Sequence, residues 1–397
     1  MVKDILMPAG IFPSEELVGQ WYSISISSEL NFFREQAYTA YLQKPLLEDK
    51  ELSKFMQISI DWALYKVTSV TAYFQASEGI WLKKLEEVYS YPLIKERVTS
   101  VLSGMHNKSA LELLVQSMYD QAYVLYIPQA TLCDEPIVLE HVQKNLGIAV
   151  SLLIIIVESE AQVTFIKRNS TSNITISVVH VFIESGASVK VVEEYNTSDN
   201  GTSIEQETWY ISQNATLTLL ESISGGTTIK INDYYLIGNY AHVEHTLLSV
   251  LQGKEKAAHS VRQHHHAKNS FSKVEAKFVL LGTSSSFYRG TISIEEEARG
   301  SQAEQYQSAL MASKDARTCA IPSLEIKTNE VHCKHGSAAA HIQEEDLWYL
   351  LSRGFERTQA QKLLIEGFLK ESPLITSYGH LGQKVLNRLN YSIEDLL

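Results

Sequence analysis

Glu160-Ala161-Gln162-Val163-Thr164-Phe165 is a short stretch whose form recurs three times farther along the chain. Each copy places an alanine before a segment in which polar and apolar side chains alternate, and this alternation has the period of a β-strand. The four alanines are 26, 28 and 26 residues apart. The later copies are Gly186-Ala187-Ser188-Val189-Lys190-Val191, Asn214-Ala215-Thr216-Leu217-Thr218-Leu219 and Tyr240-Ala241-His242-Val243-Glu244-His245.

A repeat of this length, with a small residue at a corner, is typical of a stacked β-solenoid. Each rung of such a stack buries its inner face against the neighbouring rungs. Short runs rich in Val, Ile, Thr and Tyr extend over about residues 123–341, so the β-region is longer than the four copies. An antiparallel sandwich with evenly spaced hairpins would give the same pattern, and the repeat alone leaves both architectures open.

The segments on either side of the β-region have helical patterns. Residues 14–117 are expected to be mainly helical, with Trp62–Phe74 and Trp81–Leu102 as two of the helical stretches. One helix before Pro45 carries an apolar face at helical spacing, made by Leu30, Phe33, Arg34, Ala37 and Tyr41.

The chain returns to helix after Gln343. Gly354 is expected to end the first of these helices in a left-handed conformation. The predicted organisation is a mainly β chain with an N-terminal helical domain at 1–122, a β-helix core at 123–342 and a C-terminal helical domain at 343–397.

Charge and composition restrict the partners and the compartment. The formal charge is −12, which argues against nucleic acid as a partner because phosphate binding needs a basic surface. The longest apolar run, Ile148–Val157, is too short to cross a membrane, and residues 1–13 lack the pattern of a secretory signal. Three cysteines cannot form a disulfide framework, so we expect a reducing, cytoplasmic location.

Cys333 and His335 form the pair of side chains best suited to metal or sulfur chemistry. Two residues that are two apart on a strand share a face, so a thiolate and an imidazole would lie together. An iron–sulfur cluster needs about four ligands, so the pair would form only part of a shared site. Alternatively, Cys333 is a small buried side chain and His335 a surface residue.

The C-terminal third resembles the SufB/SufD family, the scaffold subunits of the SUF iron–sulfur cluster assembly machine, and is more similar to its SufD branch. Ser337-Ala338-Ala339-Ala340 departs from the Ala-Thr-x-Gly that is usual in that branch. The residues that carry the resemblance are His265, Ala267, Ser270 and Ser272, then Phe287, Gly290 and Ile292, then Pro322-Ser323-Leu324-Glu325-Ile326, Cys333-Lys334-His335-Gly336, and Glu344–Leu369.

The resemblance implies a right-handed parallel β-helix core between helical ends. It implies a non-catalytic scaffold that pairs with a SufB-like paralogue through the β-helix, with His335 more than Cys333 at a transient iron or iron–sulfur site shared with that partner. It further implies a SufC-like ABC ATPase bound at the C-terminal helices, a possible flavin in the whole complex, and a possible homodimer when the chain is alone. Candidate ATPase contacts are Glu344, Glu345, Asp346, Trp348, Arg353 and Glu366.

Other reactive side chains support weaker hypotheses. Cys319 could relay sulfur if it were exposed and deprotonated, whereas Cys133 is expected to be structural. In His264-His265-His266, only the first and third histidines could share a metal on a strand, and solvated or packed rings are the alternative.

The chain contains no P-loop and no Rossmann fingerprint, so we expect no nucleotide site. A β-helix carbohydrate-active enzyme, a lyase or hydrolase, is the alternative function. Its candidate carboxylates are Glu193-Glu194 and Glu295-Glu296-Glu297, which we expect to be solvated surface residues.

Overall fold

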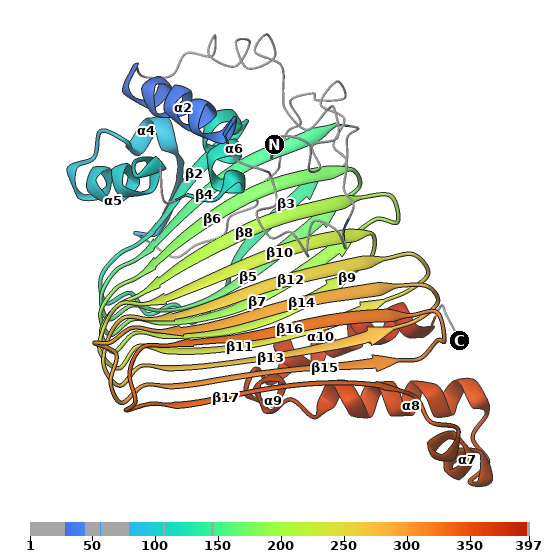
Figure 1. Ribbon diagram of the computed structural model, residues 1–397. Coiled ribbons are helices and arrows are strands. Elements are labelled where there is room, and N and C mark those ends of the chain that lie inside the picture. Colours follow the sequence, from blue (N-terminus) through green and yellow to red (C-terminus); the bar gives the residue numbers. More distant parts are fainter. Residues whose placement is uncertain (1–27, 44–55, 57–78, 106–107, 144–146, 395–397) are drawn as a thin grey trace, which may run out of the picture.

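The computed structural model describes residues 28–43, 56, 79–105, 108–143 and 147–394. The predicted helix at Trp62–Phe74 lies outside these residues. Within them, the chain forms a stack of long parallel strands with helices at both ends of the sequence (Figure 1).

The strands alternate along the sequence between two sheets, so each turn of chain adds one strand to each sheet. All neighbours are parallel except β1 and β2. The nine-stranded sheet contains β1 (Trp81–Lys84), β2 (Gln121–Ile127), β4 (Ile148–Val157), β6 (Ile174–Ile183), β8 (Thr202–Ile211), β10 (Thr227–Leu236), β12 (Lys256–His265), β14 (Ser285–Ile294) and β16 (Arg317–Ile326). The eight-stranded sheet contains β3 (Ile137–Gln143), β5 (Gln162–Thr171), β7 (Ser188–Thr197), β9 (Thr216–Ser224), β11 (His242–Leu251), β13 (Phe271–Leu280), β15 (Gln302–Met311) and β17 (His332–His341).

This topology confirms the parallel β-solenoid and rules out the antiparallel sandwich. Parallel neighbours need a connection that crosses back, and here the strand of the opposite sheet provides it. Gln162 pairs with Ser188 and Ser188 with Thr216, so the register follows the repeat seen in the sequence.

The corner alanines have the role that the repeat predicted. Ala161, Ala187, Ala215 and Ala241 are all fully buried. The residue before each alanine has a positive φ, namely Glu160 (62°), Gly186 (72°), Asn214 (56°) and Tyr240 (61°). A left-handed residue turns the chain, and the small side chain after it fits inside the tight corner.

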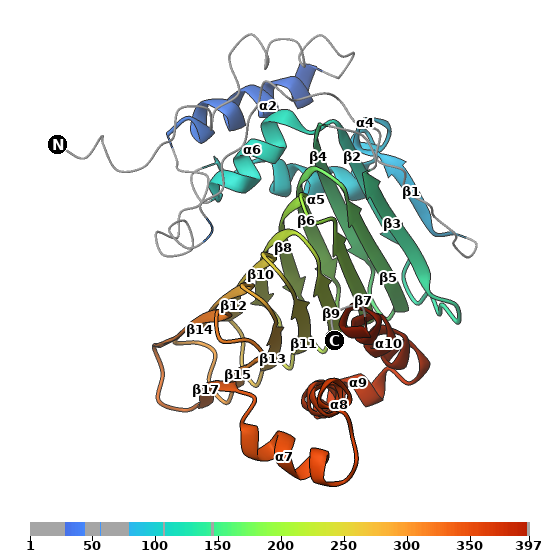
Figure 2. The same cartoon turned by 90° about the vertical axis from the view of Figure 1, so that its right-hand side faces the viewer.

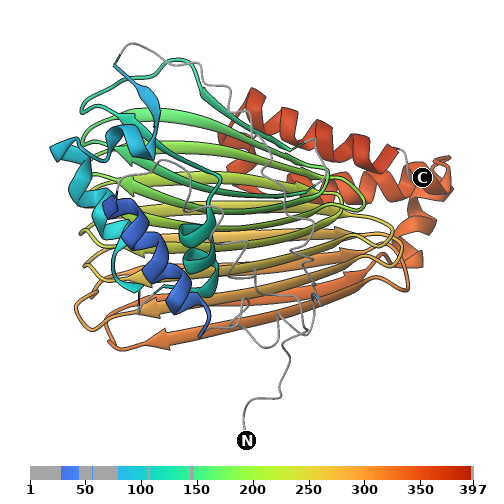
Figure 3. The same cartoon turned by 90° about the horizontal axis from the view of Figure 1, so that it is seen from above.

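The N-terminal helices cover the outer face of the nine-stranded sheet at its first rungs (Figures 2 and 3). They are α2 (Ser28–Tyr41), α4 (Leu85–Val88), α5 (Pro92–Leu102) and α6 (Ala110–Met118). Arg34 lies in the predicted inner face of α2, buried, and donates hydrogen bonds to the carbonyls of Ser117 and Tyr119. The prediction of continuous helix from Trp81 was wrong at its start, because Trp81–Lys84 pairs with β2 as a short edge strand.

The C-terminal helices pack on the outer face of the eight-stranded sheet, on the other side of the solenoid (Figure 2). Tyr378 donates its hydroxyl to the carbonyls of Val191 (2.9 Å) and Thr218 (2.6 Å), which fixes the tail to two adjacent rungs. Gly354 has φ 94°, as predicted for a helix end. These helices are α7 (Glu344–Ser352), α8 (Arg357–Lys370), α9 (Pro373–Ser377) and α10 (His380–Glu394).

Among the described helices, none combines the length and the apolar composition that a bilayer crossing requires. The division into three domains at 1–122, 123–342 and 343–397 stays a prediction. The strands of the main stack begin at Gln121 and end at His341, close to the predicted limits of the core.

Candidate functional site

Charged side chains fill the middle of the solenoid, where the two sheets face each other. Lys167, Glu193 and Glu221 follow one another in register across β5, β7 and β9. Glu205, Lys230 and His259 do the same across β8, β10 and β12. All six side chains are buried, so the interior contains a polar layer between the apolar residues near the corners.

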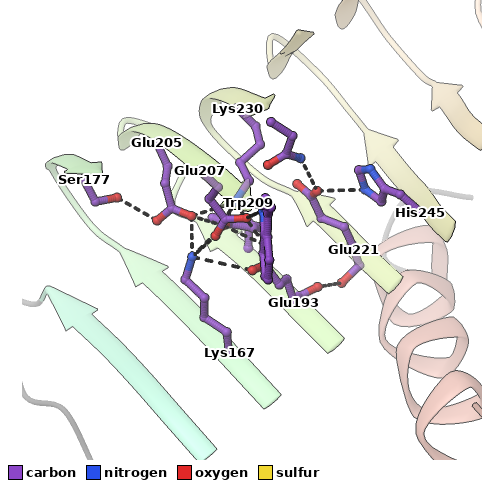
Figure 4. Close-up of polar contacts among 12 residues, drawn as sticks. Lys167, Ser177, Glu193, Glu205, Glu207, Trp209, Glu221, Lys230 and His245 are labelled. Carbon is purple, nitrogen blue, oxygen red and sulfur yellow. Dashed lines mark hydrogen bonds and ion pairs between the residues drawn. The ribbon is translucent and has the colours of Figure 1, made fainter. Parts of the chain in front are cut away.

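The two lysines are enclosed by carboxylates (Figure 4). Lys230 Nζ lies 3.0 Å from Glu193 Oε2, 2.6 Å from Glu205 Oε1 and 3.0 Å from Glu207 Oε1. Lys167 Nζ lies 2.5 Å from Glu205 Oε1 and 3.6 Å from Glu193 Oε1, and it also contacts Glu207. Each ammonium therefore has several carboxylate oxygens as acceptors, as a buried charge requires.

The network holds its members in fixed protonation states. Burial disfavours charge on Lys230, but Glu193 and the other carboxylates outweigh it and raise the pKa of the ammonium well above its ordinary value. Burial likewise opposes the charge of Glu205, yet Lys167 and Lys230 hold its pKa well below the usual range. For Glu207, burial and the nearby Glu193 raise the pKa well above that range, which favours a protonated carboxyl. Neither lysine is a free amine, so neither is suited to act as a nucleophile.

The last rung of the solenoid leaves its inner face open. Cys333 and His335 lie in register beside Ala303 and Gln305 of β15, both of which point inward. The prediction that the two side chains share a face is therefore confirmed. The described chain adds no strand beyond β17 to the eight-stranded sheet, and His335 is exposed while Cys333 is half-buried. Within the described residues, the pair forms an incomplete site at the end of the stack.

Cys333 packs against the apolar cluster of Ile292, Ile294, Ala298 and Ala303. This partial burial raises the pKa of the thiol, with a smaller opposite effect from the backbone of Ala303. The thiolate is the nucleophile and the metal ligand, so these surroundings weaken both functions in the isolated chain. His335 is the more accessible ligand of the two.

The other two cysteines are free and half-buried. Cys319 lies in β16, beside Phe287 of β14, among the apolar residues on the outer face of the nine-stranded sheet. It is therefore not in a loop, and it does not face His335. Cys133 packs against the internal apolar core, which agrees with the structural role expected for it.

The three consecutive histidines divide between the two faces of β12. His265 points inward and is fully buried, with Nδ1 2.6 Å from Ser270 Oγ and Nε2 2.7 Å from Ser272 Oγ. His264 stacks on Tyr235 with ring centroids 4.6 Å apart, and its ring centroid is 6.4 Å from that of His266. His264 and His266 thus share a face as predicted, but they stack with Tyr235 as part of an aromatic ladder.

The predicted ATPase contacts fall into two groups. Trp348 is 73 % exposed on α7, which projects from the stack, and Glu345, Asp346 and Arg353 are exposed near it. Glu344 pairs with Arg357 at the start of α8. Glu366 lies apart from them on α8, where its carboxylate pairs with Lys370 at 3.0 Å.

A polar cavity of about 430 Å³ lies between the N-terminal helices and the nine-stranded sheet. Glu112 of α6 and His180 of β6 line it, together with the ion pair between Arg262 and Asp233. Tyr210 and Tyr235 also line the cavity as part of the outer aromatic ladder.

The sequence analysis missed the internal charges, and its interpretation of Glu193 was wrong. Glu193 is 1 % exposed and lies inside the solenoid, whereas Glu194 points outward and contacts Arg168 and Arg388. A signal was available, because Lys167, Glu193 and Glu221 each stand six residues after a corner alanine. Glu295 pairs with Lys327 near the surface, so the carboxylates proposed for a carbohydrate-active enzyme do not form one groove.

Several known proteins are similar to this chain. SufD of Bacillus subtilis, described as an iron–sulfur cluster assembly protein, is 26 % identical over 255 residues, covering 62 % of this chain and 58 % of that protein. A SufBD family protein of Staphylococcus haemolyticus is 23 % identical over 295 residues, covering 71 % and 63 %. One from Mycobacterium leprae is 24 % identical over 184 residues, covering 45 % and 21 %. The chain thus spans less than two thirds of the length of each of these relatives.

The family whose pattern matches is described as "SUF system FeS cluster assembly, SufBD core domain". The match covers residues 141–368, more than half of the chain. It includes the internal charged layer, the open rung with Cys333 and His335, α7 and most of α8. The chain therefore belongs to the SufBD family of the SUF iron–sulfur cluster assembly system.

Proposed function

We propose that this chain is a non-catalytic, SufD-like scaffold subunit of a cytoplasmic SufBCD-type assembly complex. In this proposal it pairs with a SufB-like paralogue through the β-solenoid and with a SufC-like ABC ATPase through its C-terminal helices. The ATPase supplies the energy of nucleotide hydrolysis, and this chain supplies part of the surface on which an iron–sulfur cluster forms.

The observation that carries the proposal is the open inner face of the last rung. β16 and β17 expose inward-facing positions that every earlier rung covers, including Leu324 at 38 % and Ile326 at 41 %. Apolar side chains at the end of a solenoid need a cap or a partner. A second solenoid of the same width would cover them and would bring its own ligands close to His335.

The ligand count supports a shared site. An iron–sulfur cluster takes about four protein ligands, and the open rung offers His335 and, less readily, Cys333. Iron or a nascent cluster is then held between two chains and is released when they separate. A flavin belongs, if anywhere, to the complete complex, and a homodimer through the same open rung is the expected state of the chain without its paralogue.

The tail supports the second contact. α7 presents the exposed aromatic side chains Trp348 and Tyr349 beside the acidic residues of its first turn. Exposed aromatic residues of this kind are enriched at protein interfaces. We assign the ATPase contact to α7 and its junction with α8, and Glu366 becomes a secondary candidate because Lys370 already pairs with it.

The test is cluster assembly by the reconstituted three-protein complex with His335→Ala in this chain. We expect the rate of assembly to fall at least about tenfold while the complex still forms. His332→Ala is the matched control, since His332 is exposed on the same strand but has the opposite orientation. Equal assembly rates for wild type and His335→Ala would refute the role of the open rung.

A further inference from the structure

A second group of potential ligands lies inside the solenoid, next to the lysine network. Glu221 of β9, His245 of β11 and His259 of β12 are all fully buried. Glu221 Oε2 is 3.1 Å from His245 Nε2 and 3.6 Å from His259 Nε2. Figure 4 shows Glu221 and His245 pointing toward each other in the interior.

Asn232 of β10 completes the group. Its side-chain nitrogen is 3.3 Å from Glu221 Oε2 and 3.1 Å from His259 Nε2. The oxygen and nitrogen of an amide exchange places by a half-turn of the side chain, so either atom can face the group. Four neutral or anionic donors from four strands therefore converge on one point.

The spacing of these donors fits a small metal ion. Ligands at about 2.1 Å from a tetrahedral zinc ion lie about 3.4 Å from one another. The printed separations around Glu221, His259 and Asn232 lie between 3.1 and 3.6 Å. All three ionisable ligand atoms lie within 4.8 Å of one another.

Unsatisfied polar atoms provide an independent observation. Glu221 Oε1, Asn232 Oδ1 and His259 Nδ1 are buried and have no hydrogen-bond partner. Buried carboxylate and amide oxygens are normally satisfied, and a group that is not needs an explanation such as an unseen ion or water. A cation bound here would engage both oxygens.

The charge balance points the same way. The buried layer contains four carboxylates, Glu193, Glu205, Glu207 and Glu221, but its ammonium groups are only Lys167 and Lys230. The ion pairs of both lysines go to Glu193, Glu205 and Glu207. Among the described residues, Glu221 has only imidazoles as ion-pair partners, so the excess negative charge lies beside it.

A further contact orients one ligand. Tyr234 Oη lies 3.0 Å from His245 Nδ1, on the far side of the ring from Glu221. When Nδ1–H donates to this hydroxyl, Nε2 keeps its lone pair for a metal, which is the usual arrangement of a ligating histidine. The carboxylates Glu193, Glu205 and Glu207 also lie close together, but two ammonium groups occupy the space between them, so they carry no such proposal.

We propose that Glu221, His245 and His259, with the Asn232 amide oxygen as a fourth ligand, bind one divalent first-row transition metal ion inside the solenoid. A set of two imidazoles and one carboxylate suits Zn²⁺ and Fe²⁺. The site belongs to this chain alone and does not depend on the open rung or on any partner.

The experiment uses Co²⁺ alone as the probe, because its visible absorption is strong in tetrahedral coordination. The full-length chain is stripped with a chelator, incubated with Co²⁺, and measured by absorption and by elemental analysis. A parallel sample is unfolded and refolded with Co²⁺, which loads a closed interior. We expect about one ion per chain in the wild type, and at least a tenfold weaker occupancy in Glu221→Gln and in His259→Gln.

His265→Asn is the matched control, since it removes another fully buried imidazole of β12 whose partners are serines. It is expected to retain the ion. His245→Gln serves as a second ligand variant if one of the first two fails to fold, as judged by circular dichroism. Absence of Co²⁺ after both loading procedures, or full occupancy in the folded ligand variants, would overturn the proposal.

Discussion

Lys230 and Glu205 lie directly opposite each other on the neighbouring parallel strands β10 and β8, with Nζ 2.6 Å from Oε1 and both side chains buried. The pair is the centre of a charged layer inside a fold whose interior is otherwise apolar near the corners. A buried pair is costly to form and more costly to break, because the remaining charge keeps no partner.

Lys230→Met tests this layer. The substitution leaves Glu193, Glu205 and Glu207 with one ammonium group in place of two, so we expect the free energy of unfolding to fall by about 3–5 kcal/mol. Urea denaturation followed by circular dichroism measures it. Lys327→Met is the control, because its partner Glu295 is near the surface and little change is expected. Equal stability of Lys230→Met and wild type would show that the layer is not held by these pairs.

Buried histidines predict a specific dependence of stability on pH. Burial lowers the pKa of His265 from 6.5 to about 3, with His264 and His266 adding to the effect. His265 is then neutral when folded and protonated when unfolded, so unfolding takes up a proton between about pH 6.5 and 3. Stability from this group is present above pH 6.5 and falls by about 1.4 kcal/mol per unit below it.

His180 adds a second such proton, since burial and the nearby Lys108 lower its pKa to about 3. Unfolding free energies measured between about pH 7.5 and 5 give the number of protons from the slope. His265→Asn is expected to make the slope shallower by about one proton. An unchanged slope would mean that His265 is already protonated in the folded chain.

The corners offer a packing test. Ala215 is fully buried in the corner after Asn214, so Ala215→Leu is expected to destabilise the fold by about 1–3 kcal/mol through overpacking. Thermal unfolding measures the effect. Ala339→Leu is the size-matched control, because Ala339 is exposed on β17 of the open rung. Tolerance of leucine at both positions would contradict the close packing assigned to the corner.

The exposed aromatic residue of α7 allows binding to be separated from stability. Trp348→Ala is expected to leave unfolding nearly unchanged, because the side chain is 73 % exposed, and to weaken capture of a SufC-like ATPase at least about tenfold. Tyr240→Ala, also exposed but at a corner of the solenoid, is the control. Equal capture by wild type and both variants would place the ATPase contact elsewhere.

The sequence was sufficient for the features that depend on local pattern. The spacing of Ala161 and Ala187 predicted the repeat, alternation placed Cys333 and His335 on one face, and Gly354 marked a helix end. Each follows from backbone geometry that a few adjacent residues determine.

The internal charged layer could not be derived in the same way. Alternation shows that Glu193 and Glu194 face opposite sides, but not which side a second sheet covers, and Glu193 was placed in solvent for that reason. The convergence of Glu221 with His245 and His259 depends on a contact between opposite sheets, which strand spacing does not specify. Trp81–Lys84 was misjudged because four residues carry little periodicity, and pairing with β2 decides their conformation.

The most direct test of the scaffold assignment is native mass spectrometry of this chain after co-expression with a SufB-like and a SufC-like protein. We predict a stoichiometric complex of all three, from which the ATPase is lost when residues after Gln343 are removed while the SufB-like chain is retained. A well-folded chain that captures neither protein would contradict the account.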